Sequence, residues 1–271
     1  MRSKTSSAVS AVFLVVLTLT VLAVSRVHSS PSSASSSSAA HPALVELFTS
    51  EGCSSCPPAD AFLKQMDDAG QVDGIETIAI EEHVDYWDQL GWRDPFSSHR
   101  WTERQQQYAK AVRRDGIYTP QFIVDGRSEM AGSSPRKARQ DIVEASRISN
   151  ADLRLAVLGV SQSSAEVLVT VGNIPPEARS PELWLAITER GLSSDVLRGE
   201  NQGRNLTHAA ILRSLTRIRN GTASNSSGSV ETKASVAFNP AWKRENVRLV
   251  VFLQDRKTLH IIGAAASSLP R

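Results

Sequence analysis

Cysteine, aromatic residues and excess charge are all scarce in this chain. Its 271 residues include two cysteines, 6% are aromatic, and 30 basic residues nearly balance 28 acidic ones. One disulfide cannot hold together a chain of this length, so its stability has to come from hydrophobic cores. With 41% hydrophobic residues, the chain is long enough for two domains, each with a core of its own.

Acidic residues are also missing from the N-terminal part of the chain, because the first one is Glu46. Three basic residues, Arg2, Lys4 and Arg26, precede it and account for the small net charge of +2. The remaining 27 basic residues face 28 acidic ones. A nearly neutral body lacks the basic surface that binds phosphate backbones, so we expect no nucleic-acid partner.

The first residues have the pattern of a secretory signal peptide. Arg2 and Lys4 form a short positive region, residues 8–24 are apolar and uncharged, and small residues follow. We therefore expect a signal peptide over residues 1–29, a Ser-rich disordered tether over residues 30–41, and a periplasmic or secreted protein. The alternative is a membrane anchor, because the apolar run is only slightly shorter than the ~20 residues of a spanning helix. Membrane contact is expected only if this segment stays uncleaved.

Residues 42–149 alternate between strand and helix patterns. Asp125-Gly126 separates two short runs and is a strong hairpin signal. The predicted strands are residues 44–49, 75–84, 122–124 and 127–131, and the predicted helices are residues 57–69, 101–114 and 135–148. This alternation predicts an α/β domain over residues 42–149.

Residues 150–271 show almost no helical period. Runs of β type are separated by clusters of Pro, Gly, Ser and Asn. The runs are residues 153–160, 165–171, 182–188, 206–215, 230–238, 247–254 and 259–264. This spacing predicts an all-β, sandwich-like domain over residues 150–271.

The two cysteines, Cys53 and Cys56, lie two residues apart, follow a predicted strand and open a predicted helix. A CxxC in this setting is typical of a redox site. At an open helix N-terminus, unpaired N–H groups and the helix dipole favour the thiolate of Cys53. Cys56, one turn further and more sheltered, can resolve a mixed disulfide formed at Cys53. We predict an envelope or secreted thiol-disulfide oxidoreductase with Cys53 as nucleophile and Cys56 as resolving thiol.

Four stretches together resemble an uncharacterised family of secreted bacterial proteins that join a thioredoxin-like domain to a β-rich one. They read VELFTSEGCSSCPPAD, HVDYWDQLGWRDPFS, YTPQFIVDG and GENQGRNLTHAAILR, and lie between residues 44 and 213. The resemblance implies an α/β thioredoxin-like domain followed by a C-terminal all-β sandwich-like domain, but no known substrate. It also implies that Pro120 is a cis-proline facing the cysteines, with the Thr119 backbone pairing with an extended substrate.

A second candidate stretch, HVDYWDQLGW, follows the predicted strand 75–84. Because sites in α/β proteins form beyond the carboxyl ends of strands, His83 is expected near Cys53. There it would stabilise the thiolate, transfer a proton or join both sulfurs on a metal. Trp87 and Trp92 would line a groove for an apolar substrate. In the structural alternative, these residues only pack and cap an insertion.

The third polar stretch, GENQGRNLTH, spans residues 199–208. Glu200, Arg204 and His208 are candidates for an ion-paired network that contacts the cysteine-bearing domain or recognises a partner. In the alternative interpretation, the stretch is a loop that holds two strands in register.

The expected partner is a protein or small molecule that carries a thiol or a disulfide, and no cofactor or resident metal is expected. Two other functions remain open. In one, the protein is a binding module on a thioredoxin fold whose disulfide is structural. In the other, Cys53, Cys56 and His83 handle copper, because soft thiolates and imidazole suit Cu(I).

Overall fold

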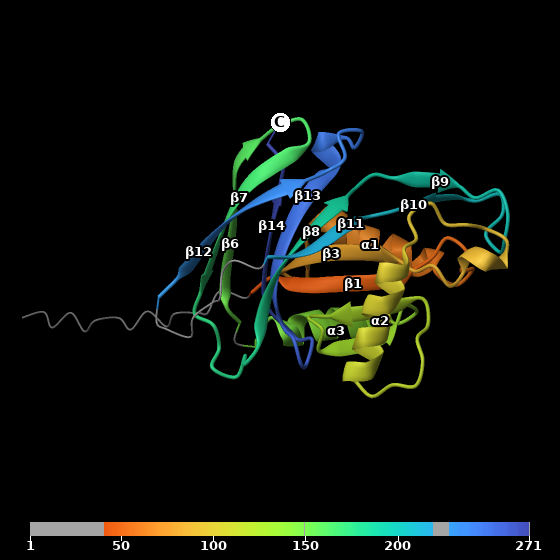
Figure 1. Ribbon diagram of the computed structural model, residues 1–271. Helices are drawn as coiled ribbons and strands as arrows, with labels where there is room; N and C mark the ends of the chain where they lie inside the picture. Colours follow the sequence, from red (N-terminus) through yellow and green to blue (C-terminus); the bar gives the residue numbers. More distant parts are fainter. Residues whose placement is uncertain (1–40, 149, 219–227, 271) are drawn as a thin grey trace, which may run out of the picture. The chain divides into compact units, whose positions relative to one another are not determined.

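Strands make up most of the regular structure (Figure 1). The computed structural model describes residues 41–148, 150–218 and 228–270, which belong to one compact unit. The expected signal peptide, residues 1–29, and the expected tether up to residue 40 lie outside the described residues. No helix within these described ranges has the length and apolar character needed to cross a membrane.

The elements alternate at first and then become purely β. The helices are α1 (Pro57–Ala69), α2 (His99–Ala111) and α3 (Pro135–Ala145), with short 3-10 turns η1 (Asp88–Leu90) and η2 (Arg244–Asn246). The strands are β1 (Ala43–Thr49), β2 (Gln71–Val72), β3 (Ile75–His83), β4 (Gln121–Val124), β5 (Ser128–Ala131), β6 (Asp152–Val160), β7 (Ser164–Gly172), β8 (Pro181–Glu189), β9 (Ser193–Asp195), β10 (Asn205–Thr207), β11 (Ile211–Ile218), β12 (Val230–Ala237), β13 (Val247–Asp255) and β14 (Ile261–Ser268).

Helix α1 positions the cysteine segment, and its ends follow from sequence. Pro57 and Pro58 occupy its first two positions, where the missing N–H groups have no partner inside the helix anyway. Gly70 ends it at φ 65°, with its N–H donating to the Met66 carbonyl. One face of the helix buries apolar residues spaced three and four apart, which presses α1 onto the sheet.

A nine-stranded mixed sheet runs through the unit in the order β14-β13-β8-β11-β3-β1-β4-β5, with β2 beside β3. Strand β3 pairs in parallel with β1 along its length. On its other side it pairs with β11 at one position, Glu81 with Ile211, next to a bond from the Glu81 N–H to the Ala210 carbonyl. Strand β11 in turn pairs antiparallel with β8 along its length.

The predicted fold class, an α/β thioredoxin-like domain plus a separate all-β sandwich-like domain, is wrong. Strands are most of the regular structure in the described residues, which hold three α-helices, and one large sheet takes strands from both sides of residue 150. Strand β11, from the predicted all-β part, joins β3 directly. Hydrophobic periodicity indicates which face of a strand is buried but not which other strand pairs with it. The sequence pattern therefore could not predict the pairing of β11 with β3.

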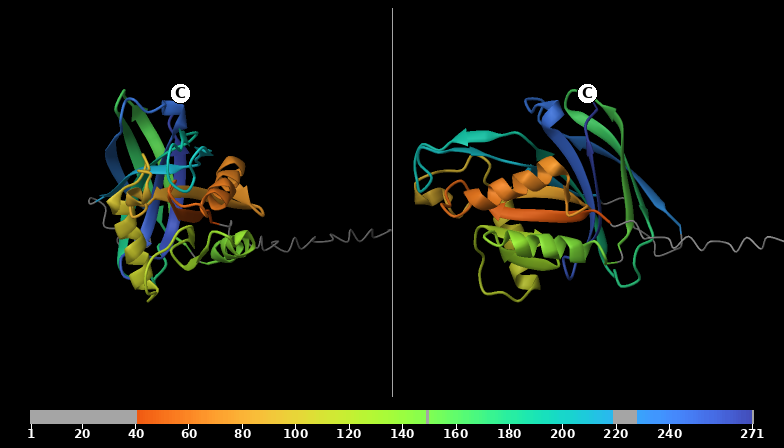
Figure 2. Two further views of the ribbon diagram at one scale, coloured as in Figure 1. Left: turned by 90° about the vertical axis from the view of Figure 1, so that its right-hand side faces the viewer. Right: turned by 180° about the vertical axis from the view of Figure 1, so that it is seen from behind.

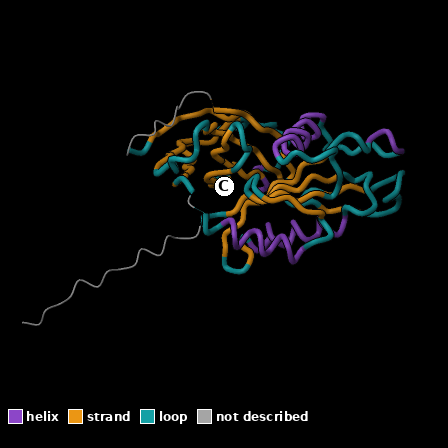
Figure 3. Tube along the Cα trace, turned by 90° about the horizontal axis from the view of Figure 1, so that it is seen from below, coloured by secondary structure: helices purple, strands orange, loops and turns teal. Residues whose placement is uncertain are grey.

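The two faces of the large sheet are covered differently. On one face, α1 and α3 cover β1, β3 and β4 around one core, while a second sheet, β12-β7-β6, packs on β8 and β13 around another. The opposite face carries α2, whose Trp101 packs against Leu44, Ile80 and Phe252. Figure 2 shows α1 and α2 on opposite sides of the strands, and Figure 3 shows the helices gathered at one end.

Most of the individual elements were predicted within a few residues, and the main error concerns residues 206–215. The pattern there predicted one strand, but the chain forms β10 and β11 with a break at His208–Ala210. At the break, the Ala209 N–H donates to Glu81 Oε2 at 2.7 Å, and the Ala210 carbonyl accepts from the Glu81 N–H at 2.8 Å. Bonds to Glu81 thus replace a continuous strand ladder.

Asp125, at the β4–β5 turn, supports a prediction about pH. Its carboxylate accepts the Leu44 N–H at 2.7 Å, and burial raises its pKa from 3.8 to about 7. The unfolded chain releases this proton as pH rises past 3.8 while the folded chain keeps it up to about 7, so stability falls across that window. Asp125→Asn, which removes the charge and keeps an acceptor, should therefore gain stability relative to the wild type as pH rises from 4 to 7, by on the order of a few kcal/mol.

Thermal melts of both proteins between pH 4 and 8 test this expectation. Asp125→Ala is the control, because it also removes the charge but leaves the Leu44 N–H without its acceptor and places alanine at φ 47°. It should be less stable than Asp125→Asn at every pH. An equal effect of Asp125→Asn at pH 4 and pH 8 would contradict the prediction.

Candidate functional site

Cys53 and Cys56 form a disulfide directly before α1, with their Cα atoms 5.4 Å apart. Both cysteines are fully buried, whereas Ser54 and Ser55 between them are exposed. The expectation that Cys53 lies on an open helix end is therefore wrong. A reagent in solution meets the two serines before it meets either sulfur.

The helix end also offers fewer free N–H groups than expected. Pro57 and Pro58 have none, and the N–H groups of Ala59 and Asp60 both donate to the Cys56 carbonyl, at 2.8 and 3.1 Å. The donors that were expected to stabilise a thiolate are thus absent or occupied. The proline pair is visible in the sequence, so this limit could have been foreseen.

The connection between β9 and β10 covers the cysteine segment. Glu200 accepts the Ser54 N–H at 3.1 Å. The buried Asn201 side chain donates to the carbonyl of Glu51 at 2.8 Å and to that of Cys53 at 2.9 Å. Residues 199–208 thus contact the cysteine-bearing part of the chain, which was one of the alternatives for this stretch, and Figure 1 shows this hairpin reaching past the end of the large sheet.

A network of buried charges joins His208, the residue after β10, to β3 and to the cysteine segment. His208 bonds through Nε2 to Glu51 Oε1 at 2.9 Å and through Nδ1 to Glu81 Oε1 at 2.8 Å. His83 bonds through Nε2 to the same Glu81 oxygen at 3.2 Å and through Nδ1 to Asp94 Oδ2 at 2.7 Å. Asp94 also accepts the Glu51 N–H at 2.8 Å. We call Glu51, Glu81, His83, Asp94 and His208 the imidazole–carboxylate network.

Neighbouring charges decide the ionisation of this network. Burial disfavours an imidazolium, but Asp94 and Glu81 outweigh it and raise the pKa of His83 well above its usual value. Burial also disfavours the imidazolium form of His208, but the charge of Glu81 outweighs it and raises the pKa of His208 to about 9. Burial alone would raise the pKa of Glu81, but the two histidines hold it far below its usual value. Opposite charges therefore compensate one another inside the protein.

Asp60 is a further buried acid close to this network. It lies on α1, one turn after Cys56, and accepts a hydrogen bond from the Thr49 hydroxyl at 2.6 Å. Burial, together with the charge of Glu81, raises its pKa from 3.8 to about 7. A carboxyl group with this pKa exchanges protons near neutral pH.

The other predicted site residues are Trp87, Trp92, Thr119 and Pro120. The indole N–H of Trp92 donates to Glu51 Oε2 at 2.8 Å, and that of Trp87 donates to the Thr119 hydroxyl at 2.8 Å. The Thr119–Pro120 peptide bond is cis. Both indole N–H groups therefore have hydrogen-bond partners inside the protein.

His83 does not meet the sulfurs in the way the sequence predicted. Both of its ring nitrogens bond to carboxylates, Asp94 and Glu81, and its links to the cysteine segment run through these carboxylates to Glu51. The copper set of Cys53, Cys56 and His83 is therefore not assembled while the disulfide is present.

Sequence reasoning missed Glu51, Glu81, Asp94 and Asn201. The signal for Glu81 was present, because the strand IETIAIEEH is apolar from Ile78 to Ile80 and charged residues that continue such a buried run require partners. Glu81 and His83 are two positions apart and share a face of β3. Asp94 and Asn201 come from irregular segments, where no helical or strand periodicity indicates which residues are in contact.

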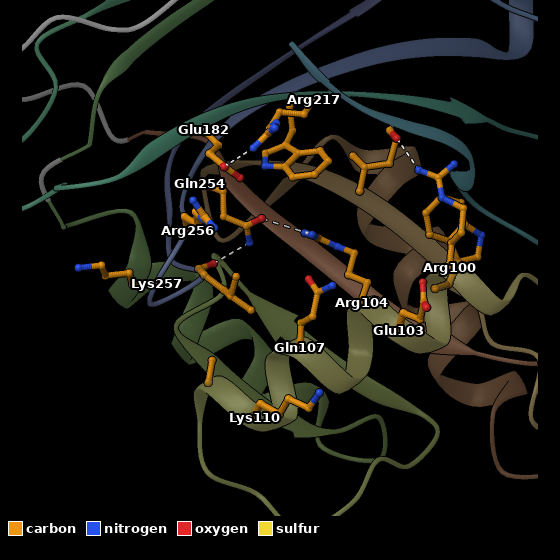
Figure 4. Close-up of a pocket in the computed structure, with 15 residues that line it drawn as sticks. Arg100, Glu103, Arg104, Gln107, Lys110, Glu182, Arg217, Gln254, Arg256 and Lys257 are labelled. Carbon is orange, nitrogen blue, oxygen red and sulfur yellow. Dashed lines mark hydrogen bonds and ion pairs between the residues drawn. The ribbon is translucent and has the colours of Figure 1, made fainter. Parts of the chain in front are cut away.

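A basic groove lies on the other face of the large sheet (Figure 4). It has a volume of about 800 Å³ and runs between α2 and strands β8, β11 and β13. Its charged lining consists of Arg100, Glu103, Arg104, Lys110, Glu182, Arg217, Arg256 and Lys257. The innermost, Arg104, is buried against Glu46 and donates to Gln254 at 3.3 Å, so it belongs to the core as well as to the groove.

A family model described as "Protein of unknown function (DUF1223)" matches residues 44–254. Among solved structures, a protein from Agrobacterium tumefaciens is similar at 26% identity, with a TM-score of 0.63, over 84% of this chain and 97% of that one. HBP35 of Porphyromonas gingivalis is similar at 16% identity, with a TM-score of 0.60, over 84% of this chain and 75% of that one, which indicates a shared fold only. No curated protein matches the chain.

The packing beside Pro120 supports a prediction about stability. A Cβ atom at Gly132 would lie 2.6 Å from Pro120 Cγ and 2.7 Å from Ala59 Cβ, between β5 and the start of α1. Gly132→Ala should therefore destabilise the fold by about 1 to 3 kcal/mol through overpacking. Gly159→Ala is the control, because a Cβ atom there meets nothing within 4 Å. Denaturant titrations of both variants test this, and equal stability of the two would contradict the packing described.

Proposed function

The chain belongs to the DUF1223 family, a family of proteins of unknown function, and on that premise we propose that it exchanges disulfides with thiols through Cys53 and Cys56. The observation that carries the proposal is the disulfide between these two cysteines at the start of α1, under a short polar cover. The proposed substrates are proteins or small molecules that carry a thiol or a disulfide. We propose a location outside the cytosol, because the N-terminal residues have the pattern of a signal peptide.

The proposed reaction transfers two electrons. In the reduced protein, the Cys53 thiolate attacks a substrate disulfide, forms a mixed disulfide and releases one substrate thiol. The Cys56 thiolate then attacks the Cys53 sulfur, which releases the second substrate thiol and leaves the Cys53–Cys56 disulfide. The substrate is reduced and the protein is oxidised, and the reverse sequence oxidises a dithiol substrate.

The small ring closed by the disulfide favours a chemical role over a structural one. The cysteines are three positions apart, so the bond restricts only a short stretch of the unfolded chain. The chain-entropy estimate for such a ring is roughly 2 kcal/mol. The fold also has several hydrophobic cores that do not involve the bond.

Access to the sulfurs requires the cover to move. Three hydrogen bonds hold it on the cysteine segment: one from the Ser54 N–H to Glu200 and two from the Asn201 side chain to the carbonyls of Glu51 and Cys53. Each is worth about 0.5 to 1.5 kcal/mol, so displacement of the cover without global unfolding is energetically accessible. We propose that reduction follows this local opening.

Burial of both sulfurs favours a second candidate, in which the disulfide is structural and the protein is a binding module. The two candidates differ in what the loss of one cysteine does. If the protein exchanges disulfides, the variant loses its activity. If the disulfide is structural, the variant loses stability.

Substitution of single cysteines separates these candidates. Cys53→Ser should abolish thiol-dependent reduction of a model disulfide protein, while Cys56→Ser should accumulate a mixed disulfide with the substrate. Both are measured by turnover and by mass spectrometry under non-reducing conditions. If wild-type protein shows no exchange and both variants lose about 2 kcal/mol of stability, the disulfide is structural.

Loosening the cover should speed up reduction. Asn201→Ala removes two hydrogen bonds to the cysteine segment and should raise the rate of disulfide reduction by a small-molecule dithiol about tenfold, the equivalent of 1.4 kcal/mol in the opening equilibrium. Asn205→Ala is the matched control, because Asn205 lies at the start of β10 and bonds only to Asp195 on the neighbouring strand β9, as the described contacts show. Its rate should equal that of the wild type. Equal rates for all three proteins would mean that this cover does not limit access.

A further inference from the structure

Two imidazole nitrogens and one carboxylate oxygen meet inside the imidazole–carboxylate network. The ligand atoms of Glu81, His83 and His208 all lie within 4.8 Å of one another, and all three residues are buried. We propose that these residues form a binding site for one divalent transition-metal ion, represented by Zn²⁺. The proposal is independent of thiol exchange at the cysteines.

The outer hydrogen bonds prepare both histidines for this role. A carboxylate can only accept hydrogen bonds, so His83 Nδ1, 2.7 Å from Asp94, and His208 Nε2, 2.9 Å from Glu51, both carry hydrogen. The remaining nitrogens, His83 Nε2 and His208 Nδ1, both face Glu81 Oε1. Metal-binding histidines in proteins are oriented in this way, with the second nitrogen bound to a carboxylate.

The inner nitrogens have two ways to face a carboxylate oxygen. Either each carries a proton, which makes two imidazolium ions with ring centroids 4.7 Å apart, or their lone pairs share a cation with Glu81. One divalent ion replaces the two protons at equal charge and removes the repulsion between two neighbouring imidazolium ions. The buried excess of carboxylates, Glu51, Glu81 and Asp94, favours a bound cation in either case.

The donor set and its spacing suit zinc. Two histidines and one carboxylate are a known zinc set, which leaves one tetrahedral position for water. Zn–N and Zn–O bonds of about 2.0 to 2.2 Å place tetrahedral ligands roughly 3.3 Å apart. The 3.2 Å from Glu81 to His83 fits this value, and the 2.8 Å from Glu81 to His208 has to widen by about half an ångström.

Backbone structure holds the three ligands in place. Glu81 and His83 share one face of β3, and His208 is fixed by the Ala209 N–H, which donates to the second Glu81 oxygen at 2.7 Å. The Phe96 ring lies 5.5 Å from the His83 ring and 5.4 Å from the His208 ring, so one side of the site is apolar. A bound ion would tie the β9–β10 hairpin to β3 beside the disulfide.

Zinc stoichiometry of the oxidised protein tests the proposal. Because the site is buried, the full-length chain is refolded with one equivalent of Zn²⁺ as well as incubated with it in the native state, and metal is measured after gel filtration. We expect one zinc per chain in the wild type. Zinc should be lost in His83→Gln and His208→Gln, and bound 10- to 100-fold more weakly by Asp94→Asn.

Two variants control for other ligands. His99→Gln removes an exposed histidine outside the site and should keep one zinc per chain. The double variant Cys53→Ser, Cys56→Ser should also keep it, which distinguishes this site from thiolate binding. The proposal is overturned if the refolded wild type holds no zinc, if zinc survives in both histidine variants, or if it disappears with the cysteines.

A second measurement does not depend on the folding of the variants. Zn²⁺ that binds the folded wild type should raise its melting temperature relative to a sample with a chelator, and the increase should grow with the logarithm of free Zn²⁺. His99→Gln should show the same increase. A wild-type melting temperature that does not respond to Zn²⁺ overturns the proposal even if the histidine variants cannot be purified.

Discussion

The compensation of buried charges in the imidazole–carboxylate network is the interaction on which the rest of the site depends. Two histidines stand among three carboxylates, all of them buried, and removing either histidine leaves a carboxylate, Asp94 or Glu51, without its charged partner in a medium of low dielectric constant. The same residues fix the geometry around the disulfide. Glu51 lies two positions before Cys53, Glu81 anchors the break between β10 and β11, and His208 joins the two. The cysteine segment, the hairpin above it and the edge of β3 are therefore held by one set of bonds.

The local structure of this protein was largely predictable, and the arrangement of its parts was not. Proline at the start and glycine after the end predicted both ends of α1 correctly, and Asp125-Gly126 predicted the β4–β5 hairpin. These signals could be used because they act within a few residues. The joint between β3 and β11 connects residues that are far apart in the chain. Apolar periodicity is the same whether a strand ends a sheet or continues it, so two domains were inferred where one sheet exists.

The site divides in the same way. The spacing of Cys53 and Cys56 was enough to mark them as candidate site residues, and the stretch around Glu200 could be singled out by its density of polar residues. Their burial could not be predicted, because it depends on distant parts of the chain, such as the hairpin from which Asn201 bonds to the Cys53 carbonyl. Glu81 and His83 were visible as charged residues on an apolar strand, but their partners Asp94 and His208 come from loops whose course depends on the whole fold. Charge on a buried strand shows that a partner exists without showing which residue it is.

The single paired position between β3 and β11 has a mechanical consequence. The backbone ladder crosses this seam at one position, whereas side chains cross it in the core that joins Leu44 and Ile80 to Phe252. Under a pulling force, the resistance at this seam therefore comes from side-chain packing and from the imidazole–carboxylate network, and not from a row of backbone hydrogen bonds.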